Sequence, residues 1–154
     1  MRTGESSEQD STRGRVMTMT DGRARVLVVD DSAAYRRAVA ELMATAECFE
    51  LVGEACCGRE ALALVRDLRP DFVLVDVRME ELDGVETARL IAQERPETVV
   101  VLMSALPAPA RLGQEPVPIP FVCKNALTAA GLCELWHARR RSRTASALVP
   151  APAQ

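Results

Sequence analysis

The chain has 154 residues, a formal net charge of −3 at neutral pH and 48% hydrophobic residues, with only 3% aromatic ones. A chain of this size folds as one domain with an aliphatic core and leaves no room for a second domain of useful size. It has neither an apolar run of about 18 residues nor a basic leader followed by an apolar stretch, which excludes a membrane span and a secretory signal. We therefore expect a cytoplasmic protein.

The two ends of the chain differ in composition from its middle. Residues 1–23 are rich in Ser, Thr, Gly, Arg and Glu without apolar periodicity, so we expect a disordered leader. Residues 24–140 carry the periodic patterns of the folded domain. Residues 141–154 are expected to form a flexible tail, first basic and then rich in Ala and Pro. The arginines of 139–143 lack interleaved aromatic residues, which argues against specific nucleic-acid binding.

The chain contains five cysteines, an odd number, and no pair of them has C-x-x-C spacing. Adjacent Cys56 and Cys57 cannot easily serve one structural zinc. We therefore expect the cysteines to be small buried or half-buried thiols in a reducing compartment.

Short apolar runs alternate with amphipathic stretches along the domain. The apolar runs predict strands at residues 25–30, 49–55, 72–75, 98–103 and 119–123. The amphipathic stretches predict helices at 33–46, 58–69, 85–95 and 126–140. Ser32 is the expected N-cap of the first helix, and the second and third helices each end at an Arg-Pro pair.

The segment 105–120 interrupts this alternation, because it contains five prolines and leaves room for about one turn of helix. With this segment counted as an impaired fourth helix, the order is strand then helix, five times. Right-handed crossovers turn such a chain into a doubly wound, five-stranded parallel sheet with helices on both faces. We predict this α/β fold with strand order 2-1-3-4-5 and with the fourth helix shortened or replaced by a Pro-rich loop.

Polar side chains follow the strands where the carboxyl ends of a parallel sheet gather. They are Asp30 and Asp31 after the first strand, Asp76 after the third, Ser104 after the fourth and Lys124 after the fifth. Crowded carboxylates resist ionisation unless a cation lies among them, and Mg²⁺ prefers oxygen ligands. The chain uses lysine only once, at this edge, where a compact ammonium suits a carboxylate or phosphoryl oxygen. The sequence thus predicts a Mg²⁺ site flanked by a lysine and a hydroxyl.

Four segments, VLVVDDS, VLVDVRM-x-x-LDG, VVVLMSA and FVCK, resemble the signature segments of response-regulator receiver domains. The resemblance covers residues 25–137 and implies a flavodoxin-like or CheY-like fold. It is strongest to receivers that precede a helix-turn-helix output domain. None follows in this sequence, so we expect a stand-alone receiver.

The resemblance also implies roles for the residues at the sheet edge. Asp76 would accept a phosphoryl group from a phosphohistidine, Lys124 would pair with Asp76 and later with the phosphoryl oxygens, and Ser104 would hydrogen-bond the phosphoryl group. The metal ligands would be Asp31, Asp76 and the backbone carbonyl of Arg78, with Asp30 acting through the water shell of Mg²⁺.

The resemblance further implies a set of partners. They would be a sensor histidine kinase or phosphotransfer protein and an unidentified output protein. Separately, we expect weak pairing of two copies of the chain and no membrane contact. The domain would be a signalling phosphoprotein and not an enzyme, apart from its self-catalysed phosphoryl transfer and slow hydrolysis.

Three features depart from the family pattern. Glu80 stands where the family has a proline, and we expect it to be a solvated loop residue. Asn125 replaces the proline that follows the lysine through a cis bond, so we expect a trans bond with Lys124 displaced or a strained loop. The third departure is the Pro-rich loop, which alters the surface that changes on phosphorylation, although Phe121 could still serve as the switching aromatic residue.

Two other function classes compete with this interpretation. A phosphatase of the haloacid-dehalogenase type also uses an Asp nucleophile, Mg²⁺ and a Lys, but it needs a second Asp where this chain has Arg78. The remaining alternative is a degenerate receiver that acts as a phosphorylation-independent interaction module. The sequence leaves this alternative open.

Overall fold

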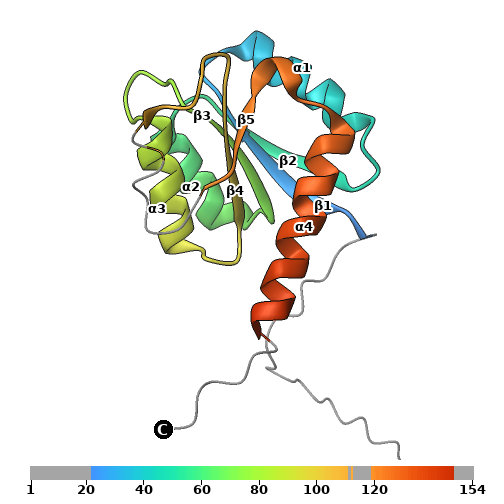
Figure 1. Ribbon diagram of the computed structural model, residues 1–154. Coiled ribbons are helices and arrows are strands. Elements are labelled where there is room, and N and C mark those ends of the chain that lie inside the picture. The colour runs from blue at the N-terminus through green and yellow to red at the C-terminus, as the bar shows by residue number, and fades with distance from the viewer. Residues whose placement is uncertain (1–21, 111, 113–118, 148–154) are drawn as a thin grey trace, which may run out of the picture.

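Five parallel strands form the central sheet of this computed structural model, which describes residues 22–110, 112 and 119–147 (Figure 1). The strands are β1 (Ala24–Val29), β2 (Phe49–Ala55), β3 (Phe72–Asp76), β4 (Val99–Ser104) and β5 (Phe121–Cys123). Their order is β2-β1-β3-β4-β5, and every neighbouring pair is parallel. The predicted fold class and strand order are confirmed.

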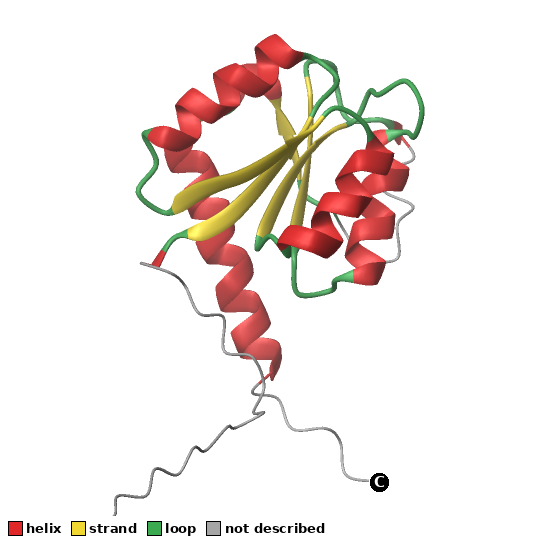
Figure 2. Ribbon diagram, turned by 180° about the vertical axis from the view of Figure 1, so that it is seen from behind, coloured by secondary structure: helices red, strands yellow, loops and turns green. Residues whose placement is uncertain are grey.

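Two layers of helices cover the sheet (Figure 2). The helices are α1 (Ala33–Ala44), α2 (Gly58–Leu68), α3 (Gly84–Glu94) and α4 (Ala129–Ala147). One hydrophobic core lies between the sheet and helices α1 and α4, and a second core lies between the opposite face of the sheet and helices α2 and α3. Successive residues of β1 alternate between the two cores, and both sets are apolar because helices cover both faces.

Large side chains fill the core between the sheet and α4. Trp136 is 1% exposed, and its ring packs edge-on against Phe72 with ring centroids 6.1 Å apart. Phe49 adds a second aromatic contact to Phe72 at 5.1 Å. These contacts fix the C-terminal helix against the sheet, in the geometry that aromatic pairs prefer.

The chain between β4 and β5 has no α-helix among its described residues. Only Ala110 and Leu112 have 3₁₀ geometry, and residues 105–109 form bends and irregular loop. Pro107 and Pro109 lack the amide hydrogen of a helix interior and clash with the preceding turn, so no α-helix forms over the described residues 105–110. The prediction that the family's fourth helix is shortened or replaced is therefore confirmed for the described part.

The C-terminal helix differs from its predicted bounds at both ends. It begins at Ala129 because Lys124–Ala126 form a separate 3₁₀ turn, and it continues to Ala147. The predicted end at 140 was wrong, since the Ala- and Arg-rich sequence beyond it consists largely of strong helix formers. Arg143 on this extension donates a hydrogen bond to the carbonyl of Glu97. The predicted leader, up to residue 21, and the tail from residue 148 lie outside the described residues.

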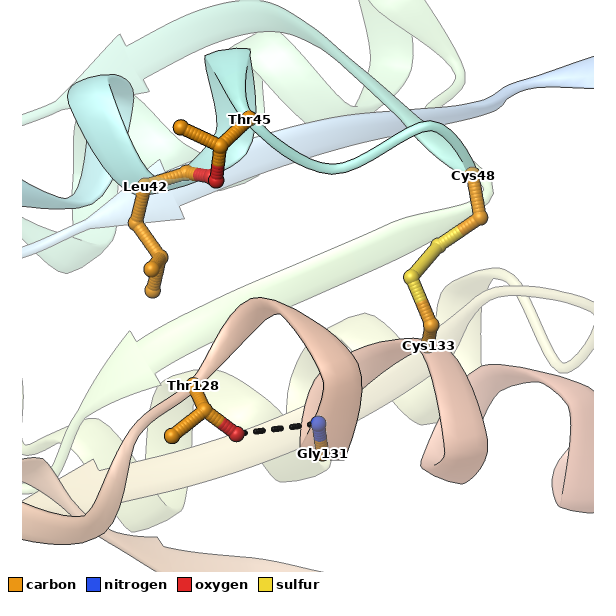
Figure 3. Close-up of a disulfide and its surroundings, with 6 residues drawn as sticks. All are labelled: Leu42, Thr45, Cys48, Thr128, Gly131 and Cys133. Carbon is orange, nitrogen blue, oxygen red and sulfur yellow. Dashed lines mark hydrogen bonds between the residues drawn. A yellow bond between two sulfur atoms is a disulfide. The ribbon is translucent and has the colours of Figure 1, made fainter.

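A disulfide joins Cys48 to Cys133, with the Cα atoms 6.2 Å apart (Figure 3). It ties the turn before β2 to α4, and the expectation that all cysteines are thiols was wrong for this pair. Sequence spacing did not indicate the pairing, because the two residues are 85 positions apart and converge only through the fold. Cys56, Cys57 and Cys123 are free thiols. In the described part of the chain, no helix is long and apolar enough to cross a membrane.

Candidate functional site

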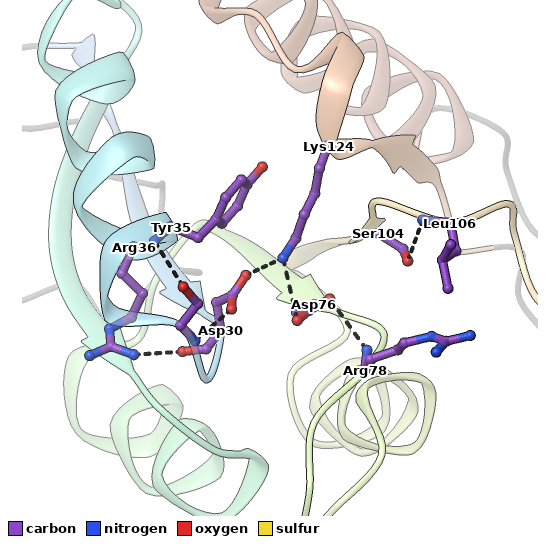
Figure 4. A network of polar contacts seen from close by, with 9 residues as sticks. Asp30, Tyr35, Arg36, Asp76, Arg78, Ser104, Leu106 and Lys124 are labelled. Atoms are coloured by element: carbon purple, nitrogen blue, oxygen red, sulfur yellow. Dashed lines mark hydrogen bonds and ion pairs between the residues drawn. The ribbon is translucent and has the colours of Figure 1, made fainter.

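The predicted site residues gather at the carboxyl edge of the sheet (Figure 4). Asp30 follows β1, Asp76 ends β3, Ser104 ends β4 and Lys124 follows β5. The parallel register aligns Asp76 with Met103 and Ser104 with Cys123, so the strand ends lie level with one another. This convergence was predicted from the strand order alone.

Lys124 lies between two buried carboxylates. Its Nζ is 2.6 Å from Oδ2 of Asp30 and 3.4 Å from Oδ2 of Asp76. Asp30 is fully buried and Asp76 is 5% exposed. Buried carboxylates are tolerated only when a counter-charge and hydrogen bonds compensate for their lost hydration, and Lys124 supplies that charge. The sequence prediction paired Lys124 with Asp76, whereas the shorter contact is to Asp30.

Asp30 is held in place by several hydrogen bonds. Its Oδ1 accepts from the backbone N–H of Ser32 at 2.8 Å, and its backbone carbonyl accepts from the Arg36 guanidinium at 2.7 Å. Its own N–H donates to the carbonyl of Ala55 at 3.0 Å. Ser32 also caps α1 as predicted, because its hydroxyl accepts from the N–H of Tyr35. The start of α1 and the end of β2 thus fix this carboxylate.

Asp76 is a carboxylate whose charged form is disfavoured. Burial raises its pKa, the negative charge of Asp30 raises it further, and Lys124 opposes the shift. The N–H of Arg78 donates to Oδ1 of Asp76 at 3.3 Å and also favours the charged form. A further cation beside Asp76 would relieve the repulsion from Asp30.

Oxygen atoms of Asp30, Asp31 and Asp76 lie within 4.8 Å of one another. Three carboxylate oxygens form a hard donor set that fits Mg²⁺, and the exposed Asp31 leaves one side open to solvent. The chemistry of these donors therefore agrees with the predicted ion. An open cavity of about 450 Å³ adjoins them, lined by Asp31, Val77, Arg78, Met79, Glu80, Asp83 and Pro109. Glu80 is exposed, as expected, and also lines this cavity.

Gly84 allows α3 to begin directly against the end of β3. A Cβ atom at this position would lie 1.9 Å from the backbone oxygen of Asp76. The N–H of Gly84 donates to the carbonyl of Val77, and Asp83 caps the helix by accepting from the N–H of Val85 at 2.7 Å. The Asp83-Gly84 pair thus allows the backbone at the start of α3 to pass close to the backbone at the end of β3, next to the site.

Tyr35 belongs to the site, although it was predicted only to lie within the helix of residues 33–46. Lys124 Nζ lies 4.0 Å from the centroid of its ring, a cation–π contact. Burial and the charges of Asp30 and Asp76 raise the pKa of Tyr35 to about 12. Its buried hydroxyl has no hydrogen-bond partner among the described atoms. Its position one helical turn beyond Asp31 is the sequence signal that would have placed this side chain at the site.

The two remaining sequence expectations concern Ser104 and Asn125. The Ser104 hydroxyl accepts from the N–H of Leu106 at 3.1 Å, so in this structure it points toward the loop. The described residues contain no cis peptide bond. The bond from Lys124 to Asn125 is therefore trans, and the 3₁₀ turn that begins at Lys124 still brings its ammonium to the carboxylates.

Curated relatives of this chain include response regulators and protein-glutamate methylesterases/protein-glutamine glutaminases. The response regulator GacA of Pseudomonas aeruginosa is 39% identical over 93 residues, which are 58% of this chain and 44% of that protein. A protein-glutamate methylesterase/protein-glutamine glutaminase of Nocardioides sp. is 43% identical over 53% of this chain and 22% of its own length. The chain thus matches less than half the length of these relatives.

Solved structures agree with the fold. The signal receiver domain of NarL from Mycobacterium tuberculosis superposes with a TM-score of 0.67 at 28% identity, covering 75% of this chain and 97% of that one. The response regulator domain of Thermotoga maritima CheB superposes with a TM-score of 0.64 at 27% identity, covering 75% of this chain and 95% of that one. The family model of the response regulator receiver domain matches residues 26–112. This chain therefore belongs to the response regulator receiver domain family, the signalling domains of two-component systems.

Proposed function

We propose that this chain accepts a phosphoryl group on Asp76 from a phosphohistidine of a sensor histidine kinase or phosphotransfer protein. One observation carries the proposal: a buried carboxylate at the end of β3 has Lys124 3.4 Å away and two further carboxylates within reach of one shared cation. Family membership supports it, since receiver domains generally bind Mg²⁺ at an acidic pocket and interact with such kinases.

In the proposed reaction, a carboxylate oxygen of Asp76 attacks the phosphorus. The bond between phosphorus and the imidazole nitrogen of the donor breaks, and that nitrogen leaves with the electron pair. Lys124 neutralises charge on the transferred group and afterwards pairs with it. Ser104 turns from the N–H of Leu106 to donate its hydroxyl hydrogen to a phosphoryl oxygen. The contribution of these side chains is positioning and charge neutralisation of a loose transition state.

Mg²⁺ would be held by Asp31, Asp76 and the carbonyl of Arg78, with Asp30 acting through its water shell, and it would supply charge neutralisation. Asp30 also keeps Lys124 close to Asp76, because the ammonium lies between both carboxylates. Tyr35 supports the same ammonium from its other side through its ring. The haloacid-dehalogenase alternative has no support in the geometry, because Arg78 provides no general acid.

The second candidate function is a receiver that works as a phosphorylation-independent interaction module. It is favoured by the altered surface between β4 and β5, where the described residues form no α-helix and Leu106 is 44% exposed. In that case the site would be structural, and the loop would bind the partner in the absence of phosphate.

Phosphorylation by a small donor tests the first proposal. The protein is incubated with acetyl phosphate and Mg²⁺, and intact-mass spectrometry measures whether one hydroxylamine-sensitive phosphoryl group is added. We expect the adduct in the wild type and in Asp67→Ala, a control at an exposed carboxylate of α2, and none in Asp76→Ala. Absence of an Asp76-dependent adduct would refute the proposal. An adduct without any change in hydrogen exchange of residues 105–110 would refute a switch through this loop.

A further inference from the structure

A second group of metal-ligating side chains lies at the junction of β2 and α2. Cys56 directly follows β2, Cys57 is the N-cap residue of α2, and Glu60 lies in the first turn of that helix. The two sulfur atoms and a carboxylate oxygen lie within 4.8 Å of one another. Cys56 and Glu60 are exposed and Cys57 is half-buried, so an ion can reach all three from solvent.

Glu60 is directed back onto the cysteines. Its Oε2 accepts from the backbone N–H of Cys56 at 2.9 Å and from the thiol of Cys56 at 3.0 Å. The backbone hydrogen bond lowers the pKa of Glu60, and the neighbouring carboxylate raises the pKa of the Cys56 thiol. The thiol of Cys56 and the carboxylate of Glu60 thus face each other at hydrogen-bonding distance, at a place where a cation could lie between them.

The backbone that carries these residues is held by packing. Gly58, buried at the first position of α2, lies so close to the start of α3 that a Cβ would be 2.4 Å from Oγ1 of Thr87 and 2.9 Å from Cβ of Leu82. On the β2 side, the carbonyl of Ala55 accepts from Asp30. Side chains mounted on such a fixed backbone need little rearrangement to converge on an ion.

We propose that Cys56, Cys57 and Glu60 form a binding site for one zinc-type divalent cation. Two thiolates and one carboxylate make a borderline-soft donor set that selects Zn²⁺ over Mg²⁺, in contrast to the all-oxygen set around Asp76. Three protein ligands leave the fourth tetrahedral position open to water or another ligand. Binding releases the thiol protons to solvent. The two thiolates balance the charge of the ion, and the carboxylate leaves the site with one net negative charge.

This site was not expected from the sequence, where adjacent cysteines gave only two ligands with poor geometry for one zinc. The helix provides the third ligand, because position 60 lies one turn beyond Cys56 and returns to it. The site is independent of phosphorylation: it uses none of the residues proposed to accept or stabilise the phosphoryl group.

Cobalt substitution tests the proposal directly. Free thiols are counted first, so that Cys56, Cys57 and Cys123 are known to be reduced, and the whole chain is then titrated with Co²⁺ alone. Co²⁺ at the all-oxygen site around Asp76 gives no thiolate band, so this band reports the cysteine site alone. We expect one thiolate-bound Co²⁺ per chain, with a thiolate-to-cobalt charge-transfer band and the intense visible bands of a tetrahedral ion. Zn²⁺ should displace it, whereas Mg²⁺ should not.

Variants assign the ligands. Cys57→Ser and Cys56→Ser should abolish the charge-transfer band or weaken Co²⁺ binding strongly. Glu60→Gln should weaken it by at least about tenfold, since even outer-sphere partners contribute this much. Cys123→Ser is the control for a thiol outside the site and should keep the band and affinity of the wild type. Asp76→Ala should keep the charge-transfer band, because the thiolate site uses no residue of the acidic pocket. The site would be overturned if the wild type showed no charge-transfer band, or if Cys57→Ser kept the wild-type band unchanged. An unchanged Co²⁺ affinity of Glu60→Gln would overturn the three-ligand arrangement.

Discussion

We predict that the disulfide between Cys48 and Cys133 contributes strongly to stability. We consider the Cys133→Ser variant, which removes the cross-link and changes little else, because serine has nearly the shape of cysteine. The bond closes a loop over a sequence separation of 85 residues and so restricts the unfolded chain strongly. Chain-entropy arithmetic for a loop of this length gives about 4.6 kcal/mol near room temperature. Since small domains are stable by only about 5–15 kcal/mol, the loss is a large fraction of the total.

Urea unfolding followed by tryptophan fluorescence measures this effect. Trp136, the only tryptophan, is 1% exposed and lies three residues from Cys133, so its emission reports unfolding of the core next to the cross-link. We expect the oxidised wild type to be more stable than Cys133→Ser by several kcal/mol. Dithiothreitol should remove most of this difference without affecting the variant.

Two controls isolate the cross-link. Cys48→Ser should match Cys133→Ser, and the double variant should be no less stable than either single variant, because all three lose the same bond. Cys123→Ser, which removes a thiol outside the disulfide, should keep the sensitivity of the wild type to dithiothreitol. Equal unfolding free energies of oxidised wild type and Cys48→Ser would refute the reasoning.

Two further predictions concern the site and its support. Gly84→Ala should lower the unfolding free energy by about 3 kcal/mol or more, because its Cβ would clash with the fixed Asp76 carbonyl. Gly53→Ala should cost only about 1 kcal/mol, since its closest contact is the movable end of Leu68; equal losses in urea unfolding would contradict this account. Asp76→Asn should stabilise the metal-free protein at pH 7, because the fold raises the pKa of this carboxyl and disfavours its charged form. This loss of folding free energy disappears as the pH falls through the raised pKa of Asp76 in the folded protein. Below about pH 4 the carboxyl is protonated in both the folded and the unfolded state. The increase in unfolding free energy caused by Asp76→Asn, measured in urea at pH 7, should therefore shrink at low pH. An increase that is independent of pH would refute the raised pKa of Asp76.

Local patterns in the sequence determined most of the fold. Apolar runs and helical stripes gave the strands and helices, and their alternation with right-handed crossovers gave the strand order 2-1-3-4-5. The same order placed Asp30, Asp76, Ser104 and Lys124 on one edge, because parallel strands end together. Pro107 and Pro109 excluded a helix from the described residues that follow β4, for local steric reasons. These features need no knowledge of which distant side chains meet.

Contacts between residues far apart in the chain were decided only by the tertiary structure. The pairing of Cys48 with Cys133, the shorter contact of Lys124 to Asp30 and the position of Tyr35 beside Lys124 each depend on how helices lie on the sheet to within a few ångströms. The convergence of Glu60 on Cys56 depends on rotamers and on where α2 begins. Periodicity specifies which face of an element is buried, but distances between facing side chains follow from packing, which the whole chain determines together.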